Sequence, residues 1–200
     1  MYIYIYIYSF FLENKFIIVG GSNDGPISSV EALDENKILP CSMPSYPVAL
    51  FGHSSTVTFS GILVCGGYSR GHASGNDCYE YKSSSPGPVP YSWTSMPPMT
   101  TERQYFDMIY LQQKVWAVGG DGGSESTNSM DIYDLNSGIW TKQSVPFSVS
   151  YHCLAELSPN KFMLIGGYNN GVSKDVMKNS IPTFFAHIKR IVQISYKLSR

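Results

Sequence analysis

A short apolar segment that ends in two glycines occurs four times in this chain. The segments read KFIIVGG, ILVCGG, VWAVGG and FMLIGG, and their glycine pairs are Gly20–Gly21, Gly66–Gly67, Gly119–Gly120 and Gly166–Gly167. The pairs recur about every 50 residues, a period typical of propeller and solenoid arrays. Each apolar run is continuous, which predicts a strand buried on both faces by neighbouring sheets. The sequence therefore predicts a row of similar β-units.

Two kinds of aromatic residue keep the same phase as the glycine pairs. Trp93 and Trp140 lie at equal distances before the next pair, and Tyr81 and Tyr133 follow the preceding one. Leu33 occupies the tyrosine position of the first unit. Large amphipathic side chains at these positions are expected to fill the space between neighbouring sheets.

The composition agrees with short strands and many turns. The 200 residues include 18 glycines and 12 prolines, and aromatic residues make up 14% of the chain. Glycine and proline favour turns, whereas aromatic residues favour strands. The formal net charge is −1, so the sequence gives no reason to expect a nucleic-acid partner. The apolar stretch Tyr2–Leu12 is too short for a membrane-spanning helix, so no transmembrane segment is expected.

This order of features resembles the kelch repeat. In that family a strand ends in Gly-Gly, a strand with a tyrosine follows, and then come a tryptophan, a proline-rich turn and a strand that opens near an arginine. Arg103 fits the arginine, and residues 115–143 are the best single match. The resemblance implies an all-β fold, a kelch-type β-propeller with blades of four-stranded antiparallel sheets. Such propellers close with about five to seven blades, so four repeats predict an incomplete or open propeller.

The sequence divides into three regions. Residues 1–14 form a low-complexity segment rich in Tyr and Ile, residues 15–177 form the repeat region, and residues 178–200 form a basic tail. The alternation of Tyr and Ile has the period of a strand, so residues 1–14 are interpreted as an edge or closing strand, or as a segment unrelated to the fold. The tail is interpreted as a basic amphipathic helix or as an aberrant end. We expect a fragment, an incomplete product, or a chain whose ring is completed by another chain.

The glycine pairs do not indicate nucleotide binding. The segment IIVGGSNDG lacks the Lys-Ser/Thr end of a P-loop and the third glycine of a dinucleotide fingerprint. No catalytic residue, cofactor or metal ligand is assigned. The kelch resemblance implies a non-catalytic protein–protein interaction module, such as a scaffold or a substrate-recruiting adaptor. The family often accompanies a BTB domain and acts with ubiquitin ligases or actin. A galactose-oxidase-like propeller fragment is the enzymatic alternative.

The connections after each glycine pair and those before each arginine-type strand are expected to meet at one end of the propeller. Arginine and tyrosine are frequent interface anchors, and loops commonly carry function. The residues predicted to bind a protein partner there are Arg70, His72, Arg103, Tyr105, Tyr151 and Asn169.

The cysteines leave the cellular compartment open. Cys65 and Cys153 lie in apolar, strand-like contexts and are interpreted as small buried core residues. The alternative is a disulfide between Cys65 and Cys78, on neighbouring strands of one hairpin. The first interpretation favours a cytoplasmic protein. The second favours a secreted or cell-surface kelch protein.

Overall fold

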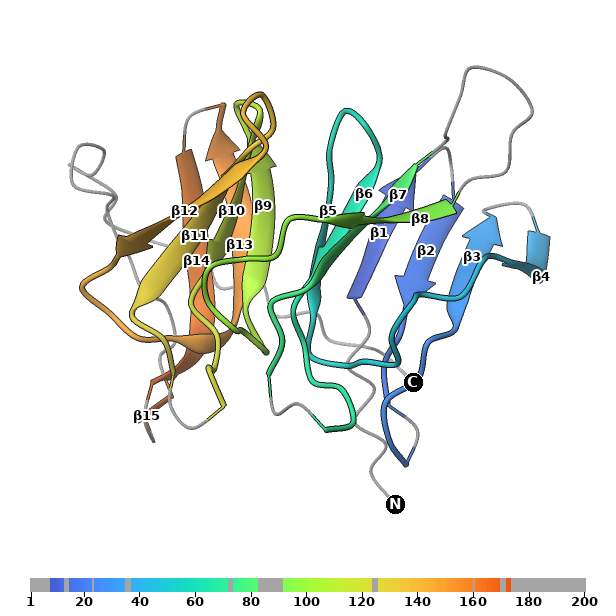
Figure 1. Cartoon of the computed structure of the whole chain (residues 1–200), viewed down its shortest axis with the longest axis horizontal. Helices are drawn as coiled ribbons and strands as arrows, with labels where there is room; N and C mark the ends of the chain where they lie inside the picture. Colours follow the sequence, from blue (N-terminus) through green and yellow to red (C-terminus); the bar gives the residue numbers. More distant parts are fainter. Residues whose placement is uncertain are drawn as a thin grey trace, which may run out of the picture.

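The computed structural model describes residues 8–12, 15–22, 24–34, 37–71, 74–82, 92–123, 126–159, 161–169 and 172–173. All regular elements within these residues are strands, arranged in four separate antiparallel sheets (Figure 1). The all-β fold class and the blade architecture predicted from the repeat are confirmed. The basic tail, residues 178–200, lies outside the described residues.

Each sheet corresponds to one repeat, and its strands follow one another in chain order. The first sheet contains β1 (Tyr8–Leu12), β2 (Lys15–Val19), β3 (Val30–Asp34) and β4 (Lys37–Ser42). The second contains β5 (Ser54–Val57), β6 (Ile62–Cys65), β7 (Cys78–Lys82) and β8 (Ser92–Met96). The third contains β9 (Asp107–Leu111), β10 (Lys114–Val118), β11 (Ser129–Asp134) and β12 (Ile139–Ser144). The fourth contains β13 (Ser150–Ser158), β14 (Lys161–Asn169) and β15 (Val172–Ser173).

The first strand of each sheet forms the inner edge of the array. β1 contacts β5, β5 contacts β9, and β9 contacts β13, so these strands lie side by side around the axis of the array. Strands β2, β6, β10 and β14 carry the glycine pairs and are the second strands of their sheets. They are not the innermost strands, because the strand that precedes each of them in the chain holds that place. The first blade also takes in Tyr8–Leu12, which pairs along its whole length with Lys15–Val19.

Strand register confirms the phase read from the sequence. Val115 pairs with Tyr133, which pairs in turn with Trp140. In the preceding sheet, Ile62, Tyr81 and Trp93 follow the same order. The aromatic rings of each such tyrosine and tryptophan lie about 5 Å apart, at 5.1 Å for Tyr81–Trp93 and 5.0 Å for Tyr133–Trp140. The repeat in sequence is therefore a repeat in structure.

The core consists of three apolar clusters, one between each pair of neighbouring sheets. All four residues of β6 are buried because sheets pack on both of its sides. Ile165 of β14, in contrast, is 36% exposed. Among the described strands, β13 makes no extensive contact with β1, so the described array is open.

Trp93 and Trp140 also link their sheets to the preceding ones. The indole N–H of Trp93 donates a hydrogen bond to the carbonyl of Pro44 at 3.0 Å, and that of Trp140 donates to the carbonyl of Pro97 at 2.9 Å. Both prolines lie just after the last strand of the preceding sheet. The apolar body of the ring fills the interface, and its polar edge finds a partner.

Candidate partner-binding face

Two kinds of connection meet at one end of the blades, the lower side of Figure 1. One follows each glycine pair, and the other joins each blade to the next. They are tied by backbone hydrogen bonds in which Gly21 donates to Leu50, Gly67 to Arg103 and Gly120 to Val149, at distances from 2.7 to 2.9 Å. The same bond in three repeats builds one continuous face from these connections.

The glycine pairs leave room for one ring per repeat. A Cβ on Gly119 would lie 2.9 Å from Cε1 of His152, and a Cβ on Gly66 would lie 2.7 Å from Cε1 of Phe106. In the last three pairs, the second glycine faces the Cβ of the ring residue of its own blade: Gly67 faces His53, Gly120 faces Phe106 and Gly167 faces His152. The ring is therefore held between the first glycine of one blade and the second glycine of the next. This arrangement explains why both glycines recur.

His53 and His152 occupy the ring position in the second and fourth blades, and both are buried. Burial lowers the pKa of His53 to about 3, although the carbonyl of Val19 opposes the shift. Burial likewise lowers the pKa of His152 to about 4, with the Val118 carbonyl opposing the shift and the nearby Arg103 charge assisting it. Both imidazoles are therefore neutral near pH 7 and act as ring-shaped packing groups.

Immediately before each ring residue lies a position with left-handed backbone. It is occupied by Gly52, Tyr105 and Tyr151, whose φ angles are 67°, 53° and 55°. Tyr105 donates its N–H to Gly52, and Tyr151 donates to Tyr105. The rings of Tyr105 and Tyr151 stack with centroids 4.3 Å apart and planes 18° apart. We call this row the tyrosine ladder; it brings together two residues predicted from the sequence.

Two further aromatic residues extend the ladder toward the second blade. Phe51 lies 6.4 Å from Tyr105 and 4.8 Å from Tyr68, measured between ring centroids. Neither Phe51 nor Tyr68 was predicted from the sequence. Tyr151 at the other end of the ladder is 48% exposed. The face therefore presents a continuous aromatic surface.

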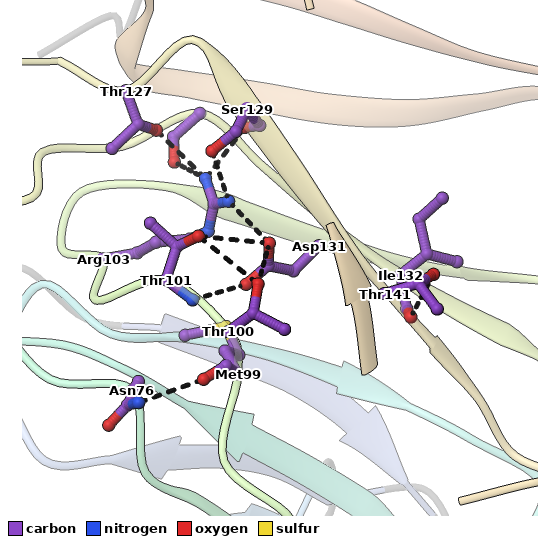
Figure 2. A network of polar contacts seen from close by, with 11 residues as sticks. Asn76, Met99, Thr100, Thr101, Arg103, Thr127, Ser129, Asp131, Ile132 and Thr141 are labelled. Carbon is purple, nitrogen blue, oxygen red and sulfur yellow. Dashed lines mark hydrogen bonds and ion pairs between the residues drawn. The ribbon is translucent and has the colours of Figure 1, made fainter. Parts of the chain in front are cut away.

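Arg103 does not belong to that surface, so its prediction as a partner-binding residue was wrong. Its side chain is fully buried and forms an ion pair of 3.1 Å with Asp131 (Figure 2). It also donates hydrogen bonds to the carbonyls of Gly119 and Ser129. Burial lowers the pKa of Arg103, and Asp131 opposes this shift. Arg103 therefore stabilises the third blade from the inside. Truncating its side chain would leave Asp131 as an uncompensated buried charge.

The other predicted contact residues have different positions. Arg70 is exposed, and its guanidinium lies 3.1 Å from the place where a Cβ of Gly25 would stand, in the neighbouring connection. Asn169 is half-buried at the end of β14, where it pairs with Val172. His72 lies outside the described residues. Arg70 therefore stays a candidate beside the ladder.

Asp107 was missed by sequence reasoning, although it joins three inner strands. Its Oδ1 accepts hydrogen bonds from the Ser54 hydroxyl at 3.0 Å and the Met108 N–H at 2.9 Å. Its Oδ2 accepts from the N–H of Leu154 at 2.6 Å. Burial raises the pKa of Asp107, and these hydrogen bonds oppose the rise. The one available signal was its place at the start of a strand, directly after a ring residue.

Cys65 and Cys78 are register partners in the two middle strands of the second sheet. Their sulfur atoms lie 2.06 Å apart, at disulfide-bonding distance, and their Cα atoms lie 4.2 Å apart. The same position in the third sheet holds the buried pair Val118 and Met130. Cys153 of β13 has a free thiol and is exposed, so its interpretation as a buried core residue was wrong. The cysteine pair thus replaces an apolar pair of the repeat.

Neither a membrane helix nor a metal cluster occurs in the part of the chain that the structure describes. No helix there is long and apolar enough to cross a membrane. No three side chains of His, Cys, Asp or Glu within the described ranges converge as a metal site would require.

The fold and the face define an open array of propeller blades, and comparison with known proteins identifies the type of repeat. Residues 102–144 match the kelch motif. Kelch-like protein 36 of Rattus norvegicus is 24% identical over 168 residues, which cover 79% of this chain and 26% of that protein. Beta-scruin of Limulus polyphemus is 27% identical over 168 residues, covering 80% of this chain and 18% of that protein.

A third relative, Kelch-like protein 8 of Mus musculus, is 30% identical over 113 residues, covering 52% of this chain and 16% of that protein. This chain therefore spans about a quarter or less of the length of these relatives. Residues 102–144 therefore carry a kelch motif, and the resemblance to kelch-repeat proteins that the sequence pattern predicted is confirmed.

Proposed function

We propose that this chain is a non-catalytic protein–protein interaction module of the scaffold or adaptor type, which binds a protein partner through the tyrosine ladder and Arg70. The observation that carries the proposal is the left-handed backbone of Tyr105 and Tyr151. Such a conformation costs a bulky residue about 1–3 kcal/mol and is concentrated at functional sites. Gly52 fills the same position without that cost.

The chemistry of the face supports a protein partner. Tyrosine and arginine are enriched among the residues that dominate binding energy. Tyr151 is half-exposed, and its ring is held in place by stacking on Tyr105. A ring that is already ordered loses little rotamer freedom when a partner covers it.

A photocrosslinking experiment tests the proposal. Tyr151 is replaced by the photoreactive residue p-benzoylphenylalanine, and the matched control carries it at Lys142, which is exposed on the outermost strand β12. Crosslinks formed in cells that produce the protein natively are identified by mass spectrometry. We expect one protein to be captured from position 151 and not from position 142.

Affinity measurements with the captured protein complete the test. Tyr151→Asn removes the ring, yet asparagine tolerates left-handed backbone. We expect Tyr151→Asn and Arg70→Ala to weaken binding at least tenfold, as loss of an interface anchor does. Lys142→Ala should change it less than twofold. Equal capture from both positions, or unchanged affinity of Tyr151→Asn, would contradict the proposal.

A secreted or cell-surface kelch protein is the second candidate, and the proximity of Cys65 and Cys78 favours it. Thiol counting on unreduced, denatured protein separates the two candidates. The chain has 4 cysteines, so an intact disulfide leaves half of them reactive. Reaction of all the thiols would exclude the secreted version.

The sequence-based proposal that another chain completes the ring has its own support in the open side of the last sheet. Register places Cys153 with Ile165 and Ala155 with Met163 on one side of that sheet. The opposite side carries Leu164 and Phe162, which pack toward the third blade. We take a second copy of the chain as the occupant of the open side, and sedimentation tests it below.

A further inference from the structure

A cleft lies between the second and third sheets, near the turn from β5 to β6 at the end opposite the glycine pairs. Its volume is about 150 Å³. The residues that line it are Thr58, Phe59, Ser60, Leu63, Glu80, Lys82, Met96, Tyr133 and Leu135. It shares no residue with the tyrosine ladder and is therefore independent of the function proposed above.

Glu80 is the unusual member of this lining. Strand register gives the equivalent positions in the first and third sheets to Ala32 and Ile132, both apolar. Glu80 is only 3% exposed. A buried carboxylate is costly unless cations and hydrogen-bond donors surround it. The second blade therefore keeps a negative charge where its neighbours use an apolar residue.

The partners of Glu80 indicate which chemistry the cleft accepts. Its carboxylate accepts hydrogen bonds from the hydroxyl of Ser60 and from the ammonium of Lys82, the latter at 2.6 Å. The Lys82 side chain is 36% exposed. Because it borders solvent, its ammonium can move into water and release Glu80 to another cation. The site that the Lys82 ammonium occupies beside Glu80 therefore suits a cationic group at the end of a flexible side chain.

The remaining walls suit the rest of such a side chain. Phe59 is 73% exposed at the turn that rims the cleft. Its ring can lie against a cation, an arrangement that guanidinium groups favour. Leu63 and Leu135 offer apolar contacts to a methylene stem. The volume is smaller than the roughly 300–1,000 Å³ of pockets that enclose drug-sized ligands, so one side chain fits better.

We propose that this cleft binds an arginine side chain of a partner protein, with Glu80 as its counter-ion and Phe59 against its guanidinium. Binding displaces the ammonium of Lys82. Arginine is preferred to lysine because its planar fork can donate two parallel hydrogen bonds to one carboxylate.

A titration of the full chain tests this inference. The probe is N-acetyl-arginine amide, and its control is N-acetyl-citrulline amide, a neutral molecule of almost the same shape. Backbone amide signals of Phe59 and Tyr133 are followed by NMR at low salt, where a surface ion pair is least screened. We expect saturable shifts with the arginine probe and none with citrulline. Equal shifts with both probes would overturn the proposal.

Three variants make the test specific. Glu80→Gln should abolish binding, and Phe59→Ala should weaken it severalfold. Lys82→Met should tighten binding at least threefold, because it removes the internal competitor. The indole N–H signals of Trp93 and Trp140 report whether each variant is folded. If Glu80→Gln unfolds, the other two variants decide. Unchanged or weaker binding by Lys82→Met, or unchanged binding by Phe59→Ala, would overturn the proposal.

Discussion

At the scale of single residues, the ring position between the glycines is occupied by either of two side chains, phenylalanine or histidine. Phe106 fills it in the third blade, whereas His53 and His152 fill it in the second and fourth. All three rings are buried. A phenyl ring has no charged form, but an imidazole does, and burial disfavours that form. The histidines therefore make the interfaces between blades sensitive to acid.

We expect the free energy of unfolding to decrease as the pH is lowered from 6.5 to about 4, because of His152. Its folded pKa of about 4 lies below the ordinary value of 6.5. Between these values the unfolded chain binds a proton and the folded chain does not, so stability decreases as pH falls. The loss attributed to His152 is about 3 kcal/mol. Urea unfolding at pH 7.5, 6.0, 5.0 and 4.5, followed by tryptophan fluorescence, measures it.

His152→Phe is the matched variant, because Phe106 already occupies the equivalent position. It should about halve the slope that the two histidines give in this window, because His53, with a folded pKa of about 3, titrates over the same range in the unfolded chain. The same slope in the variant and the parent would show that His152 is not the titrating group.

Trp140 tests the link between neighbouring sheets. It is 7% exposed and bonded to Pro97. We expect Trp140→Ala to lower the unfolding free energy by about 3–5 kcal/mol, because it leaves a large cavity. Trp140→Phe keeps much of the ring and should cost less. Equilibrium urea unfolding followed by circular dichroism compares them, and equal losses would contradict a packing role for the indole.

At the scale of elements, substitution of a paired glycine tests whether the turn at the end of the strand requires glycine. Gly119 has φ of 62°, and an added Cβ would lie 2.4 Å from the carbonyl oxygen of Val149. We expect Gly119→Ala to destabilise the chain by about 2–4 kcal/mol, because both backbone and neighbour oppose it. Gly122 offers ordinary contacts only, the nearest at 3.5 Å. Gly122→Ala should therefore be nearly neutral. Thermal unfolding of both variants measures the difference, and similar midpoints would contradict this reading of the pair.

The sequence was informative about elements and much less so about contacts between them. Apolar runs and glycine pairs predicted the strands that carry them, because strand burial and turn geometry are local properties. The tyrosine ladder was predicted in part, through Tyr105 and Tyr151, because loops were expected to meet at one end. The burial of Arg103 was not predicted, since its partner Asp131 lies on another strand and only folding brings the two together. Glu80 was missed because its unusual burial appears only when equivalent positions are aligned by register.

At the scale of the whole molecule, the open side of the fourth blade carries a consequence for association. Ile165 is exposed there, and no described sheet covers it. We expect sedimentation velocity of the 200-residue chain to show a dimer that grows with concentration. Ile165→Lys should shift the chain toward monomer, whereas the control Ile139→Lys, on the exposed side of β12, should not. A monomer at all concentrations would contradict completion by a second copy.

The central claim is that this chain is a row of blades, each stabilised by the blades beside it. Stability in such an array is the sum of each unit and its contacts with nearest neighbours. Hydrogen exchange followed by mass spectrometry, at a concentration where the chain is monomeric, measures it blade by blade. We predict the slowest exchange in β6, β7, β10 and β11, which have sheets on both sides, and faster exchange in β13 and β14. Protection of β13 and β14 equal to that of β10 and β11, or rapid exchange in all four sheets, would contradict the claim that each blade is stabilised by its neighbours.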